Sequence, residues 1–339
     1  MSKLRLIQCG VGGFGLGWLK EHTRRSPDFE LAGIVDISPD NLAKAAEICG
    51  LPAGRQFASL EAALDATEAD AVLTVTPPPV HVQHARLAFA RGLHLMTEKP
   101  IAGTIEDAKE MVELARKADR QLTVSQQYRY RPAPAKLREL LKSGVIGELG
   151  HGRLEFFIPA DFTGSFRETM DFPLLLDMAV HHVDLIRGVT GKNFTRVFAQ
   201  SFNPPWSWYR HDAGLNMLLE LEGGVPFSYT GDWSARGRGT GWNGDWRLQG
   251  SEGSLHLTKE EVRLARSEKW QRDETEEIVP LTEPVRADQA ETLHQFAEAI
   301  RTGVPNQTSG EDNLQTLGTL VAAMTSVREN RPVALAEIL

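Results

Sequence analysis

A chain of 339 residues is longer than one hydrophobic core usually serves, so its length predicts two domains. The formal net charge of −8 and the isoelectric point near 5.7 argue against a nucleic-acid or membrane partner, because each requires a clustered basic surface. Cys9 and Cys49 indicate neither a disulfide framework nor a zinc site, and we expect a cytoplasmic protein because no signal-peptide core or membrane-spanning stretch is present.

The chain opens with an apolar run, Leu4–Cys9, that predicts a buried parallel strand directly before a glycine-rich turn. Gly10 permits a tight turn from strand to helix, and Gly12 lets the backbone approach a pyrophosphate. Gly15 allows helix and strand to pack closely, and the helix N-terminus offers its N–H groups to phosphates. This spacing is a dinucleotide-binding fingerprint. The cofactor-binding residues expected here are Gly10, Gly12, Gly13, Phe14 and Gly15.

A second apolar run, Leu31–Asp36, ends about 20 residues after the glycines in the acid that the fingerprint uses to bind the adenosine ribose. A carboxylate at Asp36 also repels the 2′-phosphate of NADP(H), so NAD(H) is the expected cofactor. Lys44 and Arg55 nearby keep NADP(H) possible. The alternative interpretation is that Asp36 only ends a strand and precedes a helix cap at Ser38.

Up to about residue 124, short apolar runs alternate with helical periodicity, which predicts repeated βα units and an α/β, doubly wound parallel sheet. The predicted strands are Leu4–Cys9, Leu31–Asp36, Gln56–Phe57, Ala71–Val75, His94–Met96 and Leu122–Val124. The predicted helices are Asn41–Cys49, Leu60–Ala66, Val80–Arg91 and Ile105–Ala118. We therefore expect residues 1–124 to form an NAD-binding Rossmann domain.

After residue 124 the pattern changes to alternating runs rich in aromatic and β-branched residues, which predicts antiparallel strands in an α+β domain over residues 125–339. The expected strands are Leu149–Ile158, Val197–Phe202, Leu215–Leu221, Phe227–Trp233, Asp245–Gln249, Ser254–Leu257 and Val262–Ala265. The expected helices are Ala133–Ser143, Leu174–Gly188, Asp288–Thr302 and Glu311–Asn330.

Lys99 is the first candidate for chemistry, because it follows a predicted parallel strand and ligands bind at the carboxyl ends of such strands. An ammonium there can hydrogen-bond a substrate oxygen. The alternative is a solvated lysine paired with Glu98. The predicted strand Ala71–Val75 is followed by Thr76 and a run of prolines that begins at Pro77. These prolines stiffen a loop that we expect to flank a cofactor ribose. His81 in the same stretch either touches the cofactor or is solvated.

Asp177 and His181 are the second candidates, because a spacing of four residues places both side chains on one face of the predicted helix. Histidine titrates near neutrality and suits general acid–base work, and a carboxylate can orient it or hold a hydroxyl. Asp184 either fixes the tautomer of His181 or caps local backbone groups, and His182 is expected to be a packed core residue. No third ligand accompanies the Asp/His pair, so no metal site is expected.

These stretches together resemble the Gfo/Idh/MocA family of nicotinamide-dependent sugar and cyclitol oxidoreductases. The resemblance spans essentially the whole chain. Its most specific element is Glu98-Lys99-Pro100 followed at this distance by the Asp-x-x-x-His-x-x-Asp motif from Asp177. It also rests on Gly10-x-Gly12-x-x-Gly15, Thr76-Pro-Pro-x-x-His81, Tyr128-Arg129-Tyr130-Arg131-Pro132 and Gly144-x-Ile-Gly147.

The resemblance implies that Lys99, Asp177 and His181 assist hydride and proton transfer. It also implies a large, mostly antiparallel open sheet in the second domain, which often forms a dimer face in the family. The cofactor-binding set then extends over Asp36, Thr76, Pro77, His81, Glu98 and Lys99, and substrate contacts are expected from Lys99, Gln127, Tyr128, Arg167, Asp177, His181 and His182.

One departure concerns the stretch before the Asp-x-x-x-His motif, where many members carry a glycine cluster and this chain has Met170–Leu176. That loop lies near the substrate in the family, so the resemblance does not identify the sugar. Five tryptophans of the second half either stack on sugar rings or fill core and interface positions. They are Trp206, Trp208, Trp233, Trp242 and Trp246.

The leading hypothesis is an NAD(H)-dependent oxidoreductase acting on a secondary alcohol or ketone of a sugar, sugar derivative or cyclitol, assembled as a homodimer or homotetramer. In this hypothesis His181 exchanges the hydroxyl proton while Lys99 and Asp177 position the oxygen. Two alternatives remain open: an NAD-dependent glycosidase that oxidises its sugar transiently, and a non-enzymatic NAD(H)-binding sensor.

Overall fold

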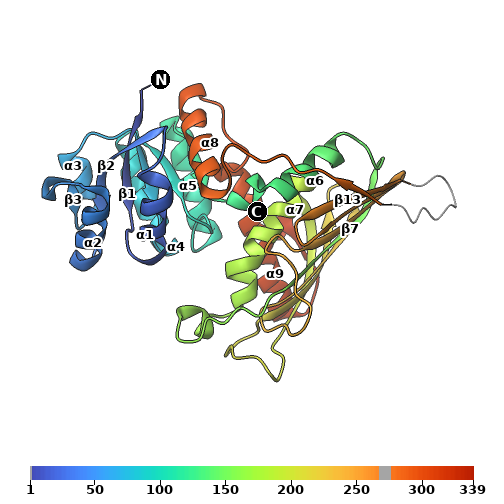
Figure 1. Ribbon diagram of the computed structural model, residues 1–339. Helices are drawn as coiled ribbons and strands as arrows, with labels where there is room; N and C mark the ends of the chain where they lie inside the picture. The colour runs from blue at the N-terminus through green and yellow to red at the C-terminus, as the bar shows by residue number, and fades with distance from the viewer. Residues whose placement is uncertain (1, 267–275) are drawn as a thin grey trace. The chain divides into compact units, whose positions relative to one another are not determined.

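The computed structural model describes residues 2–266 and 276–339, and these form two compact units (Figure 1). The first unit comprises Met1–Gln127 with Arg286–Leu314, and the second comprises Tyr128–Val285 with Gln315–Leu339. The sequence placed a single boundary near residue 125 and assigned everything beyond it to the second domain. The returning segment belongs to the first unit because its helix packs Leu293 and Phe296 into that unit's core.

The first unit is built on a six-stranded sheet in the order β3-β2-β1-β4-β5-β6, with every neighbouring pair parallel. This is the doubly wound order, in which the ligand crevice lies outside the carboxyl ends of β1 and β4, where the strand order reverses. The prediction of a Rossmann sheet is confirmed. Its strands are β1 (Leu4–Cys9), β2 (Phe29–Val35), β3 (Gln56–Phe57), β4 (Ala71–Thr74), β5 (His94–Thr97) and β6 (Leu122–Val124).

The helices of the first unit cover its sheet and bury apolar side chains against it. Trp18, Phe29 and Phe296 lie in one core cluster with residues of β1, β4 and β5, and the rings of Phe29 and Phe296 stack with centroids 5.8 Å apart. The helices are α1 (Gly13–Trp18), continued by the π-helical turn η1 (Leu19–Thr23), α2 (Pro39–Cys49), η2 (Ala53–Arg55), α3 (Leu60–Ala66), α4 (Pro78–Ala90), α5 (Ile105–Ala118) and α8 (Asp288–Thr302).

The second unit is built on a nine-stranded sheet in the order β14-β13-β12-β11-β7-β10-β9-β8-β15. Its pairs are antiparallel except for β7 with β10, which run parallel because the chain leaves β7 through a helix and returns by way of β8 and β9. The mostly antiparallel sheet is therefore confirmed. Its strands are β7 (Leu149–Phe157), β8 (Phe194–Phe202), β9 (Gly214–Leu221), β10 (Val225–Asp232), β11 (Asp245–Gly250), β12 (Gly253–Thr258), β13 (Glu261–Arg266), β14 (Glu277–Val279) and β15 (Val333–Ala334).

One face of this sheet is covered by helices, as Figure 1 shows for α6, α7 and α9. Alternate strand residues such as Met217 and Leu219 are buried in that core, whereas Leu218 between them is 65% exposed on the other face. The helices are η3 (Gln127–Tyr130), α6 (Pro132–Lys142), η4 (Phe166–Thr169), η5 (Leu174–Met178), α7 (Ala179–Thr190), α9 (Gly310–Glu329) and η6 (Leu335–Glu337).

The helix expected over Leu174–Gly188 is two segments. Leu174–Met178 is a π-helical turn, and the α-helix begins only at Ala179. Met178, at the junction, has φ −112°. Contrary to the prediction, Asp177 and His181 therefore do not lie on one face of a regular α-helix, because the backbone is wider over the turn that carries Asp177.

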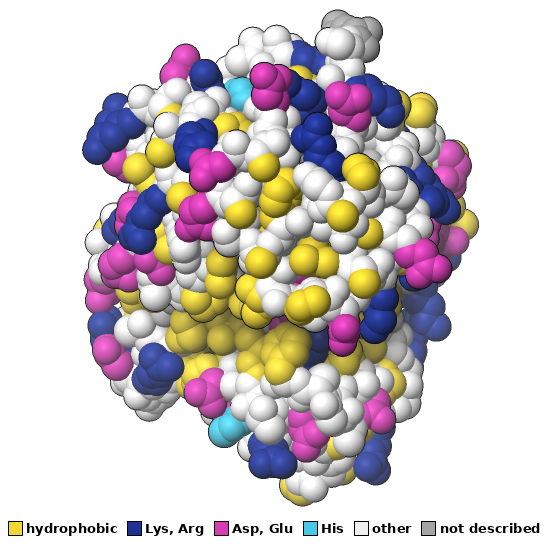
Figure 2. Space-filling model, turned by 90° about the vertical axis from the view of Figure 1, so that its left-hand side faces the viewer, with side chains coloured by type: hydrophobic (Ala, Val, Ile, Leu, Met, Phe, Trp, Pro, Cys, Tyr) yellow, Lys and Arg dark blue, Asp and Glu magenta, His cyan; other side chains and the backbone are white. Residues whose placement is uncertain are grey.

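In the described part of the chain, no helix is both long enough and apolar enough to cross a membrane. On the face that Figure 2 displays, Lys and Arg side chains are scattered among Asp and Glu side chains.

Candidate active site

The glycine turn after β1 has a shape that only glycine allows. Gly10 has φ +83°, and a Cβ on it would collide with the carbonyl oxygen of Val75. A Cβ on Gly15 would collide with the carbonyl oxygen of Gly10, so the start of α1 lies directly against the end of β1. At Gly12 a Cβ would collide with the Asn41 side chain. This cradle has the close backbone approach that a dinucleotide pyrophosphate requires.

The two residues inside the fingerprint form the first turn of α1. Gly13 has φ +45° and is the first residue of α1, and Phe14 follows it and is 59% exposed. The helix therefore presents its N-terminal end at the turn, where N–H groups and the helix dipole favour phosphate.

Asp36 fastens the glycine turn to the turn that follows β2. Its carboxylate accepts hydrogen bonds from the backbone N–H groups of Val11 (2.9 Å) and Ser38 (2.9 Å) and from Nδ2 of Asn41 (3.1 Å). The structural role that the sequence offered as an alternative is thus present. It does not exclude ribose binding, because the side chain is half-buried and a carboxylate has about four acceptor sites.

His81 is fully buried, so the expectation of a solvated histidine is wrong. Its Nδ1 lies 3.0 Å from the carbonyl oxygen of Ile101, and its Nε2 lies 3.0 Å from the carbonyl oxygen of Thr76. Both ring nitrogens are therefore engaged inside the protein, and burial lowers the pKa of the imidazole. We assign His81 the role of holding the loop of Thr76 and Pro77, of which Pro77 is exposed.

Glu98 and Lys99 follow β5 at the same sheet edge as the glycine turn. The carboxylate of Glu98 is buried and accepts hydrogen bonds from Nε1 of Trp18 (2.8 Å) and from the backbone N–H of Lys99 (3.0 Å). Burial raises the pKa of Glu98. The side chain of Lys99 is half-buried. Glu98 is therefore a structural link between β5 and α1 that holds the backbone of Lys99 at the carboxyl end of the sheet.

Several buried polar atoms at this edge have no hydrogen-bond partner among the described residues. They include Oγ1 of Thr97 at the end of β5, both amide atoms of Gln126 and Oε1 of Gln127 after β6. Buried amides in folded proteins are nearly always bonded, so unsatisfied groups mark a place where a polar ligand or ordered water binds. Gln127 was expected from the sequence, whereas Gln126 was not, because nothing in the residue order distinguishes a buried glutamine.

His181 in the second unit is held flat against an aromatic ring. The imidazole stacks on Tyr128 with ring centroids 4.3 Å apart and planes 8° apart, and both side chains are buried. The guanidinium carbon of Arg131 lies 3.4 Å from the centroid of the same tyrosine ring. Two groups this close cannot occupy one face, so Tyr128 separates a cation from the imidazole. Arg131 was not predicted as a site residue. It lies three residues after Tyr128, and the residue order alone does not show that its guanidinium covers the ring.

Asp177 and Arg167, named separately from the sequence, form an ion pair. Nε of Arg167 donates to Oδ2 of Asp177 at 2.5 Å, and the side chains are 30% and 16% exposed. Arg167 comes from η4 and Asp177 from η5, so the pair ties the loop before Met170 to the turn that precedes α7.

His182 is a core residue, so its predicted substrate contact is not supported. Its Nε2 lies 3.0 Å from the carbonyl oxygen of Trp242 and its Nδ1 lies 3.1 Å from the hydroxyl of Tyr229. Burial lowers its pKa from 6.5 to about 4, so the ring is neutral at physiological pH. A substrate would have to break two buried hydrogen bonds to reach either nitrogen.

Asp184 bonds to an arginine rather than fixing the tautomer of His181. Its carboxylate accepts from Nε (2.6 Å) and Nη2 (2.7 Å) of Arg129 and from the Thr316 hydroxyl (3.0 Å). The Arg129 and Asp184 side chains are only 5% and 1% exposed. Because Arg129 neighbours Tyr128 and Asp184 lies in α7 with His181, this pair fixes the two halves of the stack relative to each other.

Both halves of the chain match models of one family of known proteins. Residues 4–126 match the oxidoreductase family with an NAD-binding Rossmann fold, and residues 135–256 match the GFO/IDH/MocA C-terminal domain. The chain belongs to the GFO/IDH/MocA oxidoreductase family. It is therefore an NAD-binding oxidoreductase, and the resemblance and the cofactor predicted from the sequence are both confirmed.

Relatives of this GFO/IDH/MocA chain include named sugar and cyclitol dehydrogenases. D-apiose dehydrogenase of Paraburkholderia graminis is 28% identical over 97% of this chain and 88% of its own length. Inositol 2-dehydrogenase of Corynebacterium glutamicum is 30% identical over 66% of each chain. An oxidoreductase from Agrobacterium radiobacter, solved with NAD+, L-tartaric acid and magnesium, shares the fold with a TM-score of 0.89 at 20% identity, and the match covers 100% of both chains.

The tryptophans of the second half take different positions. Trp233 and Trp246 are buried in the core, and Trp208 is half-buried and donates from Nε1 to the Ala160 carbonyl oxygen at 3.0 Å. Trp206 and Trp242 are 48% and 45% exposed. Trp233 and Trp246 are therefore core residues. Trp206 and Trp242 are exposed enough either to stack on a sugar ring or to lie in a subunit interface.

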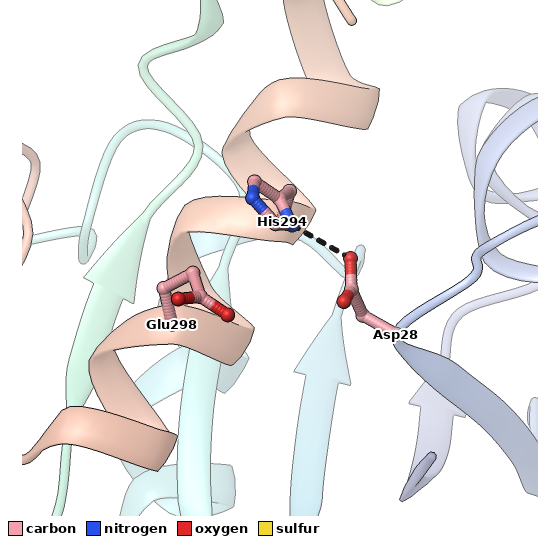
Figure 3. A group of neighbouring side chains, drawn as sticks. All are labelled: Asp28, His294 and Glu298. Carbon is pink, nitrogen blue, oxygen red and sulfur yellow. Dashed lines mark hydrogen bonds and ion pairs between the residues drawn. The ribbon is translucent and has the colours of Figure 1, made fainter. Parts of the chain in front are cut away.

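One group of side chains in the described residues brings three potential metal ligands together. Ligand atoms of Asp28, His294 and Glu298 lie within 4.8 Å of one another (Figure 3), with Asp28 before β2 and the other two on α8. His294 Nδ1 lies 2.8 Å from Asp28, and Nη1 of Arg301 donates to Asp28 at 2.8 Å and to Glu298 at 2.9 Å. A guanidinium thus supplies the positive charge, and the group acts as an ion-pair network that fastens α8 to the segment before β2 within the first unit.

Proposed function

We propose that this chain interconverts a secondary alcohol and a ketone on a sugar, sugar derivative or cyclitol, with NAD(H) as the redox partner. The observation that carries the proposal is the buried imidazole of His181, stacked on Tyr128 in the unit that also carries Asp177. An imidazole can take and return a proton, and this one is fixed in place by an aromatic ring and a buried ion pair, which suits it to general acid–base catalysis. The names of the dehydrogenase relatives support the substrate class.

The residues of the first unit are proposed to hold the cofactor. The cradle of Gly10, Gly12 and Gly15 takes the pyrophosphate, and Asp36 accepts hydrogen bonds from the adenosine ribose. The unsatisfied amides of Gln126 and Gln127 offer polar contacts at the carboxyl end of the sheet. When bound, NAD supplies a nicotinamide that exchanges a hydride with a substrate carbon.

In the proposed reaction, His181 takes the proton of the substrate hydroxyl during oxidation and returns it during reduction. Lys99 donates a hydrogen bond to the substrate oxygen and stabilises the negative charge that develops there. Asp177 accepts a hydrogen bond from the same or a neighbouring hydroxyl and so orients the sugar.

The test is a substrate panel run in both directions. Purified protein is mixed with NAD or NADP and a set of polyols, cyclitols and aldoses, or with NADH and the corresponding ketones, and absorbance at the NADH band is followed. We expect NADH to form with at least one compound and the rate to fall at least about 100-fold in His181→Gln, as for removal of a general base. If no compound is turned over in either direction, the proposal is contradicted.

The same panel, with a nitrophenyl glycoside added, separates the two alternatives. An NAD-dependent glycosidase would release nitrophenol from a nitrophenyl glycoside without net NADH, and a sensor would bind NAD(H) without turning anything over.

We further propose a homodimer or homotetramer that uses the open face of the nine-stranded sheet, where Leu218 is exposed, and light scattering measures the assembly directly. The cytoplasmic location stays a prediction.

A further inference from the structure

Part of the Arg167 guanidinium makes no hydrogen bond within the described residues. Its Nε is bonded to Asp177, but neither Nη nitrogen donates a hydrogen bond to a residue in the ranges 2–266 and 276–339. The side chain is 30% exposed. A guanidinium has five N–H donors in a planar fork, so the Nη edge keeps donors aimed away from Asp177.

The guanidinium is held in place by aromatic rings. Its central carbon lies 4.8 Å from the ring centroid of Phe162 and 4.7 Å from that of Phe166. Phe162 packs edge-on against the buried Trp233 with ring centroids 5.2 Å apart, whereas Phe166 is 66% exposed. A cation fixed by two rings and a carboxylate loses little freedom when a ligand binds, so its open edge is preorganised.

The chemistry of that edge matches a carboxylate. Arginine binds carboxylates through two parallel N–H···O bonds, and such charge-assisted bonds are stronger than neutral ones. The fixed negative charge of Asp177 lies on the Nε side of the same guanidinium. A singly charged carboxylate therefore suits the site better than a phosphate dianion, which would meet stronger repulsion from Asp177.

We propose that the substrate is a sugar acid whose carboxylate is bound by the Nη edge of Arg167, with the exposed ring of Phe166 beside the sugar. This inference rests on the proposed function, because it takes Asp177 as a residue that orients the substrate. A competing role for Arg167 is a structural latch that only ties its loop to Asp177. A latch would affect neutral and acidic sugars equally.

The test uses matched compounds that differ in charge: D-glucose, D-glucuronate, D-gluconate and D-glucose 6-phosphate, with the galactose series in parallel. The variants are Arg167→Met and Arg167→Lys. The control is Arg210→Met, which removes the charge of an exposed arginine that pairs with Glu168. We expect an acid to have the highest kcat/KM. In Arg167→Met its KM should rise about 10- to 100-fold, the cost of a charged hydrogen bond, with a smaller rise in Arg167→Lys and none in Arg210→Met.

The proposal is overturned if neutral sugars are turned over as well as the acids, if the 6-phosphate is preferred, or if Arg167→Met lowers kcat/KM for neutral and acidic partners equally. If no compound of this set or of the wider panel is turned over, the proposed function fails, and thermal shifts with NAD and the compounds of this set still decide the question of binding. Stabilisation by D-glucuronate or D-gluconate that is lost in Arg167→Met supports the carboxylate site. No stabilisation of the wild type by any acid contradicts it.

Discussion

Replacement of Asp184 by asparagine should destabilise the second unit strongly. The carboxylate of Asp184 is 1% exposed and accepts two bonds of 2.6 and 2.7 Å from Arg129, which is itself 5% exposed, and one of 3.0 Å from Thr316. Asparagine keeps the shape of the side chain but removes its charge. The buried guanidinium of Arg129 then loses this counter-charge in a setting where water cannot replace it.

The size of the effect follows from burial. Removing one partner of a buried ion pair costs about 3–5 kcal/mol, because the other charge stays desolvated. At about 2–4 °C per kcal/mol for a domain of 150–250 residues, the melting temperature of this unit should fall by roughly 6–20 °C. Calorimetry and urea unfolding followed by circular dichroism measure the loss.

The control is an ion pair of equal length that lies on the surface. Arg196 and Glu220 are 2.6 Å apart, but their side chains are 58% and 36% exposed. Glu220→Gln should leave the melting temperature unchanged within error, because solvent screens exposed pairs. If Asp184→Asn melts within about 2 °C of the wild type, or no lower than Glu220→Gln, the argument that burial makes this pair important is refuted.

Three further outcomes are expected. Tyr128→Phe should keep the stack on His181 and most of kcat, whereas Tyr128→Leu should lower kcat up to about 100-fold with NAD affinity unchanged. An equal loss of kcat in both variants would contradict a role for the ring. Asp36→Asn should raise the NADP-to-NAD ratio of kcat/KM roughly tenfold, or about 1.4 kcal/mol, and an unchanged ratio would show that Asp36 does not select the cofactor. Because burial lowers the pKa of His182 from 6.5 to about 4, the unfolded chain binds a proton in that range that the folded chain does not. The free energy of unfolding should therefore fall as pH drops from about 6.5 to 4, more steeply in the wild type than in His182→Asn, and equal slopes would contradict the assignment.

The first unit could be predicted from the sequence almost element by element, because its signals are local. The strand Leu4–Cys9 and the helix Ile105–Ala118 have the predicted bounds, since an apolar run and an amphipathic period each end at clear turn or cap residues. Thr104 caps that helix by accepting a hydrogen bond from the N–H of Asp107 at 3.1 Å.

Features that depend on distant segments could not be predicted in this way. The strands Glu277–Val279 and Val333–Ala334 are too short to show periodicity, and the parallel pairing of β7 with β10 depends on the path of the chain between them. The return of Arg286–Leu314 to the first unit has the same cause, because an amphipathic helix does not specify which core it covers.

The site shows the same division between local and distant information. Motif spacing identified His181 and Asp177, but the partners that hold them are Tyr128 and Arg167, which come from other elements. The prediction that Asp184 fixes the tautomer of His181 was wrong because the actual partner of Asp184 comes from another element. An acid three residues after a histidine is a plausible neighbour along one helix, and the stronger partner, Arg129, lies elsewhere in the sequence.

The most direct test of the account is to follow the transferred hydrogen. A substrate found in the panel is prepared with deuterium on the carbon that bears the reacting hydroxyl, and the NADH formed by the wild-type enzyme is analysed by mass spectrometry. The account predicts that this NADH carries one deuterium, and that the signal is lost in His181→Gln while NAD binding persists. NADH without deuterium, or equal formation of deuterated NADH by the variant, would contradict it.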